Sequence, residues 1–110
     1  MGKEFEPQGI VVALATPLDA GEGLDEIGLR RLVNHVMTGG IHGDLVPGSQ
    51  GEFYGLTPEE KRRILEVVVD EVGGRVAIYA GTGSITTKES VALTRMAEEV
   101  GADAVSVLTP

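Results

Sequence analysis

The sequence has no cysteine and no tryptophan, and only four of its 110 residues are Phe or Tyr. Without cysteine, the chain has no disulfide framework, no thiolate metal site and no cysteine nucleophile. With so few aromatic side chains, a core must be built from Val, Leu, Ile and Ala. Such a core suits strands that are buried on both faces.

Long apolar runs and positive charge are also scarce. No run approaches the roughly 18 residues of a membrane span, and the N-terminal stretch MGKEFEPQG lacks the apolar core of a signal peptide. Nine Lys and Arg stand against 17 Asp and Glu, which gives a formal net charge of -8. Because clustered positive charge drives phosphate binding, we expect no nucleic-acid partner and no membrane partner. These features predict a soluble, cytoplasmic chain.

Short apolar runs alternate with amphipathic segments along the chain. Four runs have the length of buried strands, and they occupy residues 10–14, 45–47, 76–80 and 103–108. The three segments between them have helical periodicity. They begin after the capping residues Asp25, Thr57 and Thr86 and end at Gly39-Gly40, Gly73-Gly74 and Gly101.

The second of these helices has the clearest start. Thr57 is a capping residue, Pro58 suits the first helical position, and Glu60 completes the spacing of a capping box. One face of this helix is apolar and carries Ile64, Leu65, Val68 and Val72. The other face is expected to carry most of the charged residues, which are Lys61, Arg62, Arg63, Glu66 and Asp70.

The strands start about thirty residues apart, which is the length of a strand, a crossover helix and two short loops. Repetition of this unit predicts a parallel sheet with right-handed crossovers. Periodicity alone leaves two architectures open, a doubly wound sheet and part of a closed barrel. We expect residues 1–8 to be a tail and residues 9–110 to be one folding unit that looks cut after its fourth strand, since a whole barrel needs about 250 residues.

Ligand sites of parallel sheets lie beyond the carboxyl ends of the strands. The loops there are Ala15-Thr16-Pro17, Gly48-Ser49-Gln50-Gly51-Glu52, Gly81-Thr82-Gly83-Ser84 and Thr109-Pro110. In the second loop, Gly48 and Gly51 permit a backbone that turns the amides of Ser49 and Gln50 together toward an anion such as a carboxylate. A simple chain reversal is the alternative interpretation of the same residues.

Two other site classes find little support. The loop of residues 81–84 lacks the lysine of a Walker motif and the full GxGxxG pattern, so nucleotide binding is not expected. His35 and His42 have no third ligand near them in sequence, so no metal site is expected. We predict no metal and no cofactor.

Five segments occur together in one order: Ala13 to Pro17, Gly48 to Glu52, Leu56 to Lys61, Ala80 to Ser84 and Gly101 to Ala104. Taken together, they resemble the N-terminal half of the dihydrodipicolinate synthase and N-acetylneuraminate lyase family, and the likeness runs from Gly9 to Pro110. The resemblance implies an α/β fold, half of a (β/α)8 TIM barrel with four parallel strands and three helices. Family members usually assemble as homotetramers, so a homo-oligomer is expected.

The resemblance also implies a chemistry. A lysine on the sixth strand of such enzymes forms a Schiff base with pyruvate or another 2-oxo acid for aldol addition or cleavage, and a fifth-strand tyrosine assists proton transfer. Ser49 and Gln50 match the loop that binds the substrate carboxylate, and Ser49 matches the hydroxyl that joins the proton relay. Gln50 stands where dihydrodipicolinate synthases usually have a second threonine, which leaves the identity of the 2-oxo acid open.

The nucleophile of that chemistry has no match in this chain. Its lysines are Lys3 in the tail, Lys61 on the second helix and Lys88 at the start of the third, and its tyrosines are Tyr54 and Tyr79. We therefore expect an inactive N-terminal piece of a Schiff-base lyase. The alternative is a non-catalytic module that self-associates as a scaffold or binds small carboxylates.

Overall fold

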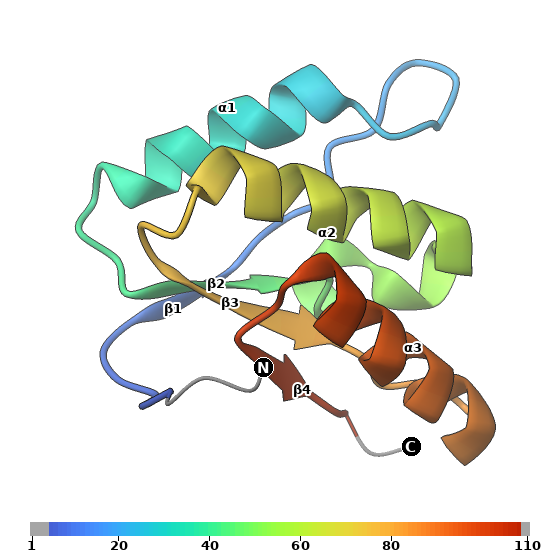
Figure 1. Cartoon of the computed structure of the whole chain (residues 1–110). Helices are drawn as coiled ribbons and strands as arrows, with labels where there is room; N and C mark the ends of the chain where they lie inside the picture. The colour runs from blue at the N-terminus through green and yellow to red at the C-terminus, as the bar shows by residue number, and fades with distance from the viewer. Residues whose placement is uncertain (1–4, 109–110) are drawn as a thin grey trace.

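The structure, a computed structural model, describes residues 5–108 and consists of a parallel sheet covered by helices (Figure 1). The strands are β1 (Val11–Ala13), β2 (Gly43–Val46), β3 (Ala77–Gly81) and β4 (Ala104–Ser106). The helices are α1 (Glu26–Met37), α2 (Pro58–Val72) and α3 (Thr87–Val100). Two short 3-10 turns, η1 (Ser49–Gly51) and η2 (Phe53–Gly55), connect β2 to α2.

The strands lie side by side in chain order, and each neighbouring pair is parallel. A doubly wound sheet reverses its strand order at a switch point, whereas a barrel adds each strand to the same edge. When each new strand is added to the same edge, right-handed crossovers also place every connecting helix on the same face of the sheet. The structure therefore decides between the two architectures and confirms the prediction of half a (β/α)8 barrel.

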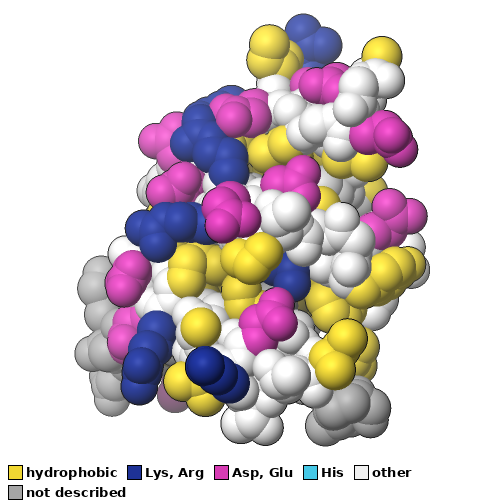
Figure 2. Space-filling view, turned by 90° about the vertical axis from the view of Figure 1, so that its right-hand side faces the viewer, with side chains coloured by type: hydrophobic (Ala, Val, Ile, Leu, Met, Phe, Trp, Pro, Cys, Tyr) yellow, Lys and Arg dark blue, Asp and Glu magenta, His cyan; other side chains and the backbone are white. Residues whose placement is uncertain are grey.

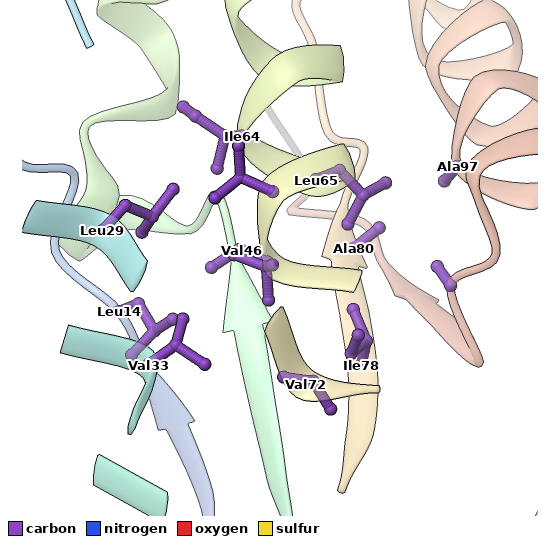
Figure 3. Packing of buried hydrophobic residues seen from close by; sticks show 13 residues of the cluster. Leu14, Leu29, Val33, Val46, Ile64, Leu65, Val72, Ile78, Ala80 and Ala97 are labelled. Carbon is purple, nitrogen blue, oxygen red and sulfur yellow. The ribbon is translucent and has the colours of Figure 1, made fainter. Parts of the chain in front are cut away.

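The core lies between the sheet and the helices, as Figure 3 shows. Val46, Ile78 and Ala80 of the sheet and Leu65 of α2 belong to this cluster, and their side chains are buried. The remaining buried apolar residues of this cluster are Leu14, Leu29, Val33, Ile64, Val67, Val68, Val72, Ala97 and Ala102. The cluster contains no aromatic side chain, as the composition predicted.

The other face of the sheet has no helix over it in the described part of the chain. Ala13, Leu45, Tyr79 and Ala104 are in register across the strands and form one layer of this face. Ala13 is exposed, and the other three are half-buried. This face corresponds to the inside of a barrel, and the layer carries no charged side chain.

The helices begin where the sequence predicted. The Asp25, Thr57 and Thr86 side chains each accept a hydrogen bond from a backbone N–H of the first turn. At Thr57 the bond is reciprocated, because the Glu60 carboxylate accepts the Thr57 N–H at 2.9 Å. No helix within residues 5–108 is long and apolar enough to cross a bilayer.

Strand bounds differ more from the prediction. β2 begins at Gly43, two residues before the predicted run. The prediction missed this start because the aspartate at position 44 interrupts the apolar pattern. β4 is shorter than predicted and ends at Ser106. The predicted loop Thr109-Pro110 lies outside the described residues.

The prediction that Lys61 lies on the charged face of α2 is wrong. Its side chain is buried, with 5% of the residue exposed. The Lys61 Nζ lies 5.7 Å from the centroid of the Phe53 ring, a cation–π distance. Helical periodicity does not take account of other segments, and here the loop before α2 covers the first turn of the helix.

Asp44 is a carboxyl group buried in the middle of β2. It is in register with Val12 and Ile78, and it is 0% exposed. Neither carboxyl oxygen has a hydrogen-bond partner in the described part of the chain. Burial removes water from the charged form, which raises the pKa of Asp44 from its ordinary value of 3.8 to about 6.

This burial predicts that stability falls as pH rises. Between pH 4 and 6, the unfolded chain loses the Asp44 proton more readily than the folded chain, and two pKa units correspond to about 3 kcal/mol. Asp44→Asn removes the titration, so the variant should lose this slope in urea denaturation measured from pH 4 to 7. Glu98→Gln, which removes an exposed carboxylate, should keep it. Equal slopes in Asp44→Asn and the original chain would contradict the assignment.

Candidate functional site

The loops beyond β2, β3 and β4 meet around a small cavity of about 130 Å³. Figure 2 views the molecule from the side toward which the strands of Figure 1 run, and charged side chains of both signs lie there among hydrophobic ones. The residues that line the cavity come from three strands and their loops and are Leu45, Pro47, Gly48, Ser49, Phe53, Gly81, Gly83, Ser106 and Leu108. All of them are uncharged, so any anion in this cavity would have to be held by dipoles.

The turn η1 supplies such dipoles. It starts after Gly48, which is extended, and its first two amides are those of Ser49 and Gln50. The first N–H groups of a helical turn have no acceptor within the turn. Among residues 5–108, neither amide donates a hydrogen bond. Two adjacent N–H groups thus have no acceptor among the described residues and are available to an anion. The predicted backbone freedom of Gly48 is not what shapes the turn, because Gly48 has a φ of -110° and the left-handed residue is Glu52, with a φ of 56°.

The carbonyl groups of the same peptide units are fully engaged. The peptide that carries the Ser49 N–H has the Gly48 carbonyl at its other end, and that oxygen accepts from Gly51 at 3.0 Å and Phe53 at 3.3 Å. The peptide that carries the Gln50 N–H has the Ser49 carbonyl, which accepts from Glu52 at 3.0 Å. The hydrogen bonds to these two carbonyl oxygens therefore hold both peptide planes, and the directions of their N–H groups are set before any ligand arrives.

A close contact with β3 holds the start of this loop. Gly81 ends β3, and a Cβ at this position would overlap the carbonyl oxygen of Pro47. Only glycine allows the two backbones to approach so closely. The distance between β3 and the Ser49 turn is thus set by the absence of a side chain at position 81.

The predicted binding residues do not lie equally close to the cavity. Ser49 lines it, whereas Gln50 is exposed and does not. Gln50 can therefore contribute through its backbone N–H while its side chain faces solvent. Phe53, whose ring lies beneath the Lys61 ammonium, also forms a wall of the cavity.

The remaining candidates have structural partners. Thr82 of the glycine-rich loop accepts from the Thr94 hydroxyl at 3.0 Å, and its burial keeps its own hydroxyl away from a phosphate in solvent. The Nδ1 of His42 accepts the Ile10 N–H at 2.9 Å. No group of three or more His, Cys, Asp or Glu side chains in the described ranges is arranged to hold a metal ion.

A model of the dihydrodipicolinate synthetase family matches residues 6–110. The chain is 45% identical over 103 residues to a 4-hydroxy-tetrahydrodipicolinate synthase of Methanothermobacter thermautotrophicus, covering 94% of this chain and 36% of that protein. The chain thus spans about a third of the length of the curated relatives it matches. The family model and the similarity to this relative therefore indicate the same protein family.

Solved structures give the same result. The CdNal protein of Clostridium difficile, solved in complex with mannosamine, superimposes with a TM-score of 0.92 at 36% identity, covering 96% of this chain and 37% of that one. YagE of E. coli K12, described as a member of the dihydrodipicolinic acid synthase family and solved in complex with pyruvate, gives a TM-score of 0.89 at 33% identity. That match covers 93% of this chain and 34% of YagE.

The contact at Gly81 yields a test of the site geometry. Gly81→Ala pushes the Pro47 carbonyl away, so we expect it to lower the free energy of unfolding by roughly 1–3 kcal/mol and to shift the amide signals of Ser49 and Gln50. Gly55→Ala is the matched control, because a Cβ at Gly55 would meet no atom within 4 Å. Urea denaturation and amide NMR spectra would measure both effects. Indistinguishable stabilities of the two variants would show that the contact does not constrain the loop.

Proposed function

Because this chain belongs to the dihydrodipicolinate synthetase family, we propose that it provides the carboxylate-binding half of a lyase that acts on pyruvate or another 2-oxo acid. The reaction is an aldol addition or cleavage through a Schiff base. The observation that carries the proposal is the pair of free amides at Ser49 and Gln50, next to a cavity with an uncharged lining. The pyruvate bound to YagE, a structural relative, supports the choice of ligand class.

The binding chemistry follows from the turn. A carboxylate that accepts two backbone N–H groups gains charge-assisted hydrogen bonds without a buried counter-ion. The Ser49 hydroxyl would stand beside the bound acid, where it can pass a proton to and from the reacting group. Glutamine at position 50 retains the amide and changes only the side chain, so it affects the choice of 2-oxo acid more than the capture of the carboxylate.

The 110-residue chain by itself is proposed to bind without forming the imine. Lys61 is covered by Phe53, and Lys88 is exposed at the start of α3, on the helical side of the sheet. Lys3 lies outside the described residues. A Schiff base needs an amine that can reach the carbonyl carbon of the bound acid, and neither described lysine is on a strand.

Two substitutions at Ser49 separate its amide from its hydroxyl. Ser49→Pro removes the N–H at the first position of the turn, where proline fits and where the preceding Gly48 is extended. We expect pyruvate affinity, measured by calorimetry, to fall about tenfold or more, because a hydrogen bond to a charged group is lost. Ser49→Ala keeps the N–H and should bind within about twofold of the original chain.

Methyl pyruvate, which lacks the carboxylate, should bind to none of these proteins. Borohydride added to the pyruvate samples should leave the intact masses unchanged. Equal binding by Ser49→Pro and the original chain would refute the role of the amide. A reduced pyruvate adduct would refute the proposal that no lysine is recruited.

The face of the sheet that carries no helix, where the Phe5 ring packs edge-on against Tyr79, favours a second candidate function, a self-associating scaffold. Within residues 5–108, β1 pairs only with β2 and β4 only with β3, so both edges of the sheet offer unpaired backbone groups. Near these edges Ile10 and Leu108 are exposed apolar residues. The layer between the edges is neutral, so two copies can meet there in spite of the net charge of -8. We propose that the 110-residue chain forms homo-oligomers through this face.

A charge on this face should prevent the association. Ala13 is exposed on β1, so Ala13→Glu introduces a carboxylate without a steric clash and should shift the chain to monomer in size-exclusion chromatography with light scattering. Ala20→Glu places the same charge in the exposed loop before α1 and should leave the mass unchanged. A monomeric original chain at micromolar concentration would rule this function out.

A further inference from the structure

We propose that Thr16 is a positioning residue for the substrate carboxylate, acting through a chain of hydrogen bonds that ends at the Gln50 N–H. Thr16 follows β1 and is 35 residues away from Gly51 in sequence, yet its hydroxyl donates to the Gly51 carbonyl at 2.6 Å. Thr16 does not line the cavity itself. The inference rests on the proposed function of the Ser49-Gln50 amides and adds a residue to it.

The chain of bonds passes through two peptide units. The Gly51 carbonyl that accepts from Thr16 shares its peptide plane with the Glu52 N–H, and that N–H donates to the Ser49 carbonyl at 3.0 Å. The Ser49 carbonyl in turn shares its plane with the Gln50 N–H. The Thr16 hydroxyl, the Gly51–Glu52 peptide and the Ser49–Gln50 peptide therefore form one series, in which each group donates to the carbonyl of the next. The last N–H of this series is one of the two free donors of the site.

A series of this kind strengthens its final donor. Each hydrogen bond accepted by a carbonyl polarises the peptide and makes its own N–H more positive. The Thr16 bond is short for an O–H···O bond, so the polarisation starts from a strong contact. Removing the hydroxyl should weaken the Gln50 donor more than the Ser49 donor, whose peptide is held by Gly51 and Phe53 instead.

Thr16 is well placed to set the geometry because its own segment is tied to the sheet. The Leu14 N–H donates to the Leu45 carbonyl of β2 at 3.2 Å. A Cβ at Gly51 would lie 2.9 Å from the Thr16 Oγ1 and 3.1 Å from the Leu14 carbonyl oxygen, so the turn lies directly against this segment. The sheet thus sets the position of the hydroxyl, and the hydroxyl sets the orientation of the turn.

The test compares Thr16→Val, Thr16→Ser and Thr38→Val in the 110-residue chain. Valine matches threonine in shape and lacks the hydroxyl. Thr38→Val is the control, because the Thr38 hydroxyl also donates to a backbone carbonyl at 2.6 Å, that of His35 near the end of α1. Amide NMR spectra of each protein without ligand report the Gln50 and Ser49 donors, and titration with pyruvate reports the dissociation constant.

We expect Thr16→Val to move the Gln50 amide proton upfield more than that of Ser49 and to raise the pyruvate dissociation constant about three- to tenfold. Thr16→Ser should restore both values, and Thr38→Val should change neither. A Gln50 signal that responds equally to Thr16→Val and Thr38→Val would overturn the inference. If the original chain binds no pyruvate, the proposed function fails, while the Gln50 signal without ligand still decides the role of Thr16.

Discussion

The in-register pairing of four parallel strands is the constraint on which the rest of this structure depends. Parallel pairing places the carboxyl ends of β1 to β4 at one edge, and this alone brings Ser49, Gly81 and Leu108 around one cavity. Consecutive strand order then puts the helices on one face and leaves the other face for the inside of a barrel. The core between sheet and helices is aliphatic and holds the strand ends rigidly.

The site itself is made mainly of backbone. Its donors are the amides of Ser49 and Gln50, and its walls are largely glycine, proline and apolar side chains. What distinguishes it from an ordinary turn is the support behind it: a threonine hydroxyl, a glycine that admits a neighbouring carbonyl, and carbonyl groups that are already bonded. A carboxylate bound there, as proposed, would meet preorganised donors, since the two peptide planes need no rearrangement when the anion arrives.

Two buried charged residues show where local patterns fail. Asp44 interrupts an apolar strand and Lys61 breaks the polar face of a helix, yet both lie in the interior. Their consequences differ. The Asp44 carboxyl has no partner in the described residues and acquires a raised pKa, whereas the Lys61 ammonium has the Phe53 ring over it. Phe53 in turn walls the cavity, so the lysine supports the site without entering it.

The sequence by itself determined the features that depend on neighbours along the chain. Helix starts at Asp25, Thr57 and Thr86 followed from capping, and the strand-helix repeat followed from periodicity. Tertiary structure decided the burial of Lys61 and the bond from Thr16 to Gly51, and its strand order confirmed the barrel that the family resemblance implied and that periodicity left open. The reason is that these features join segments distant in sequence, whose contacts are set by strand order and close backbone approach rather than by any local pattern.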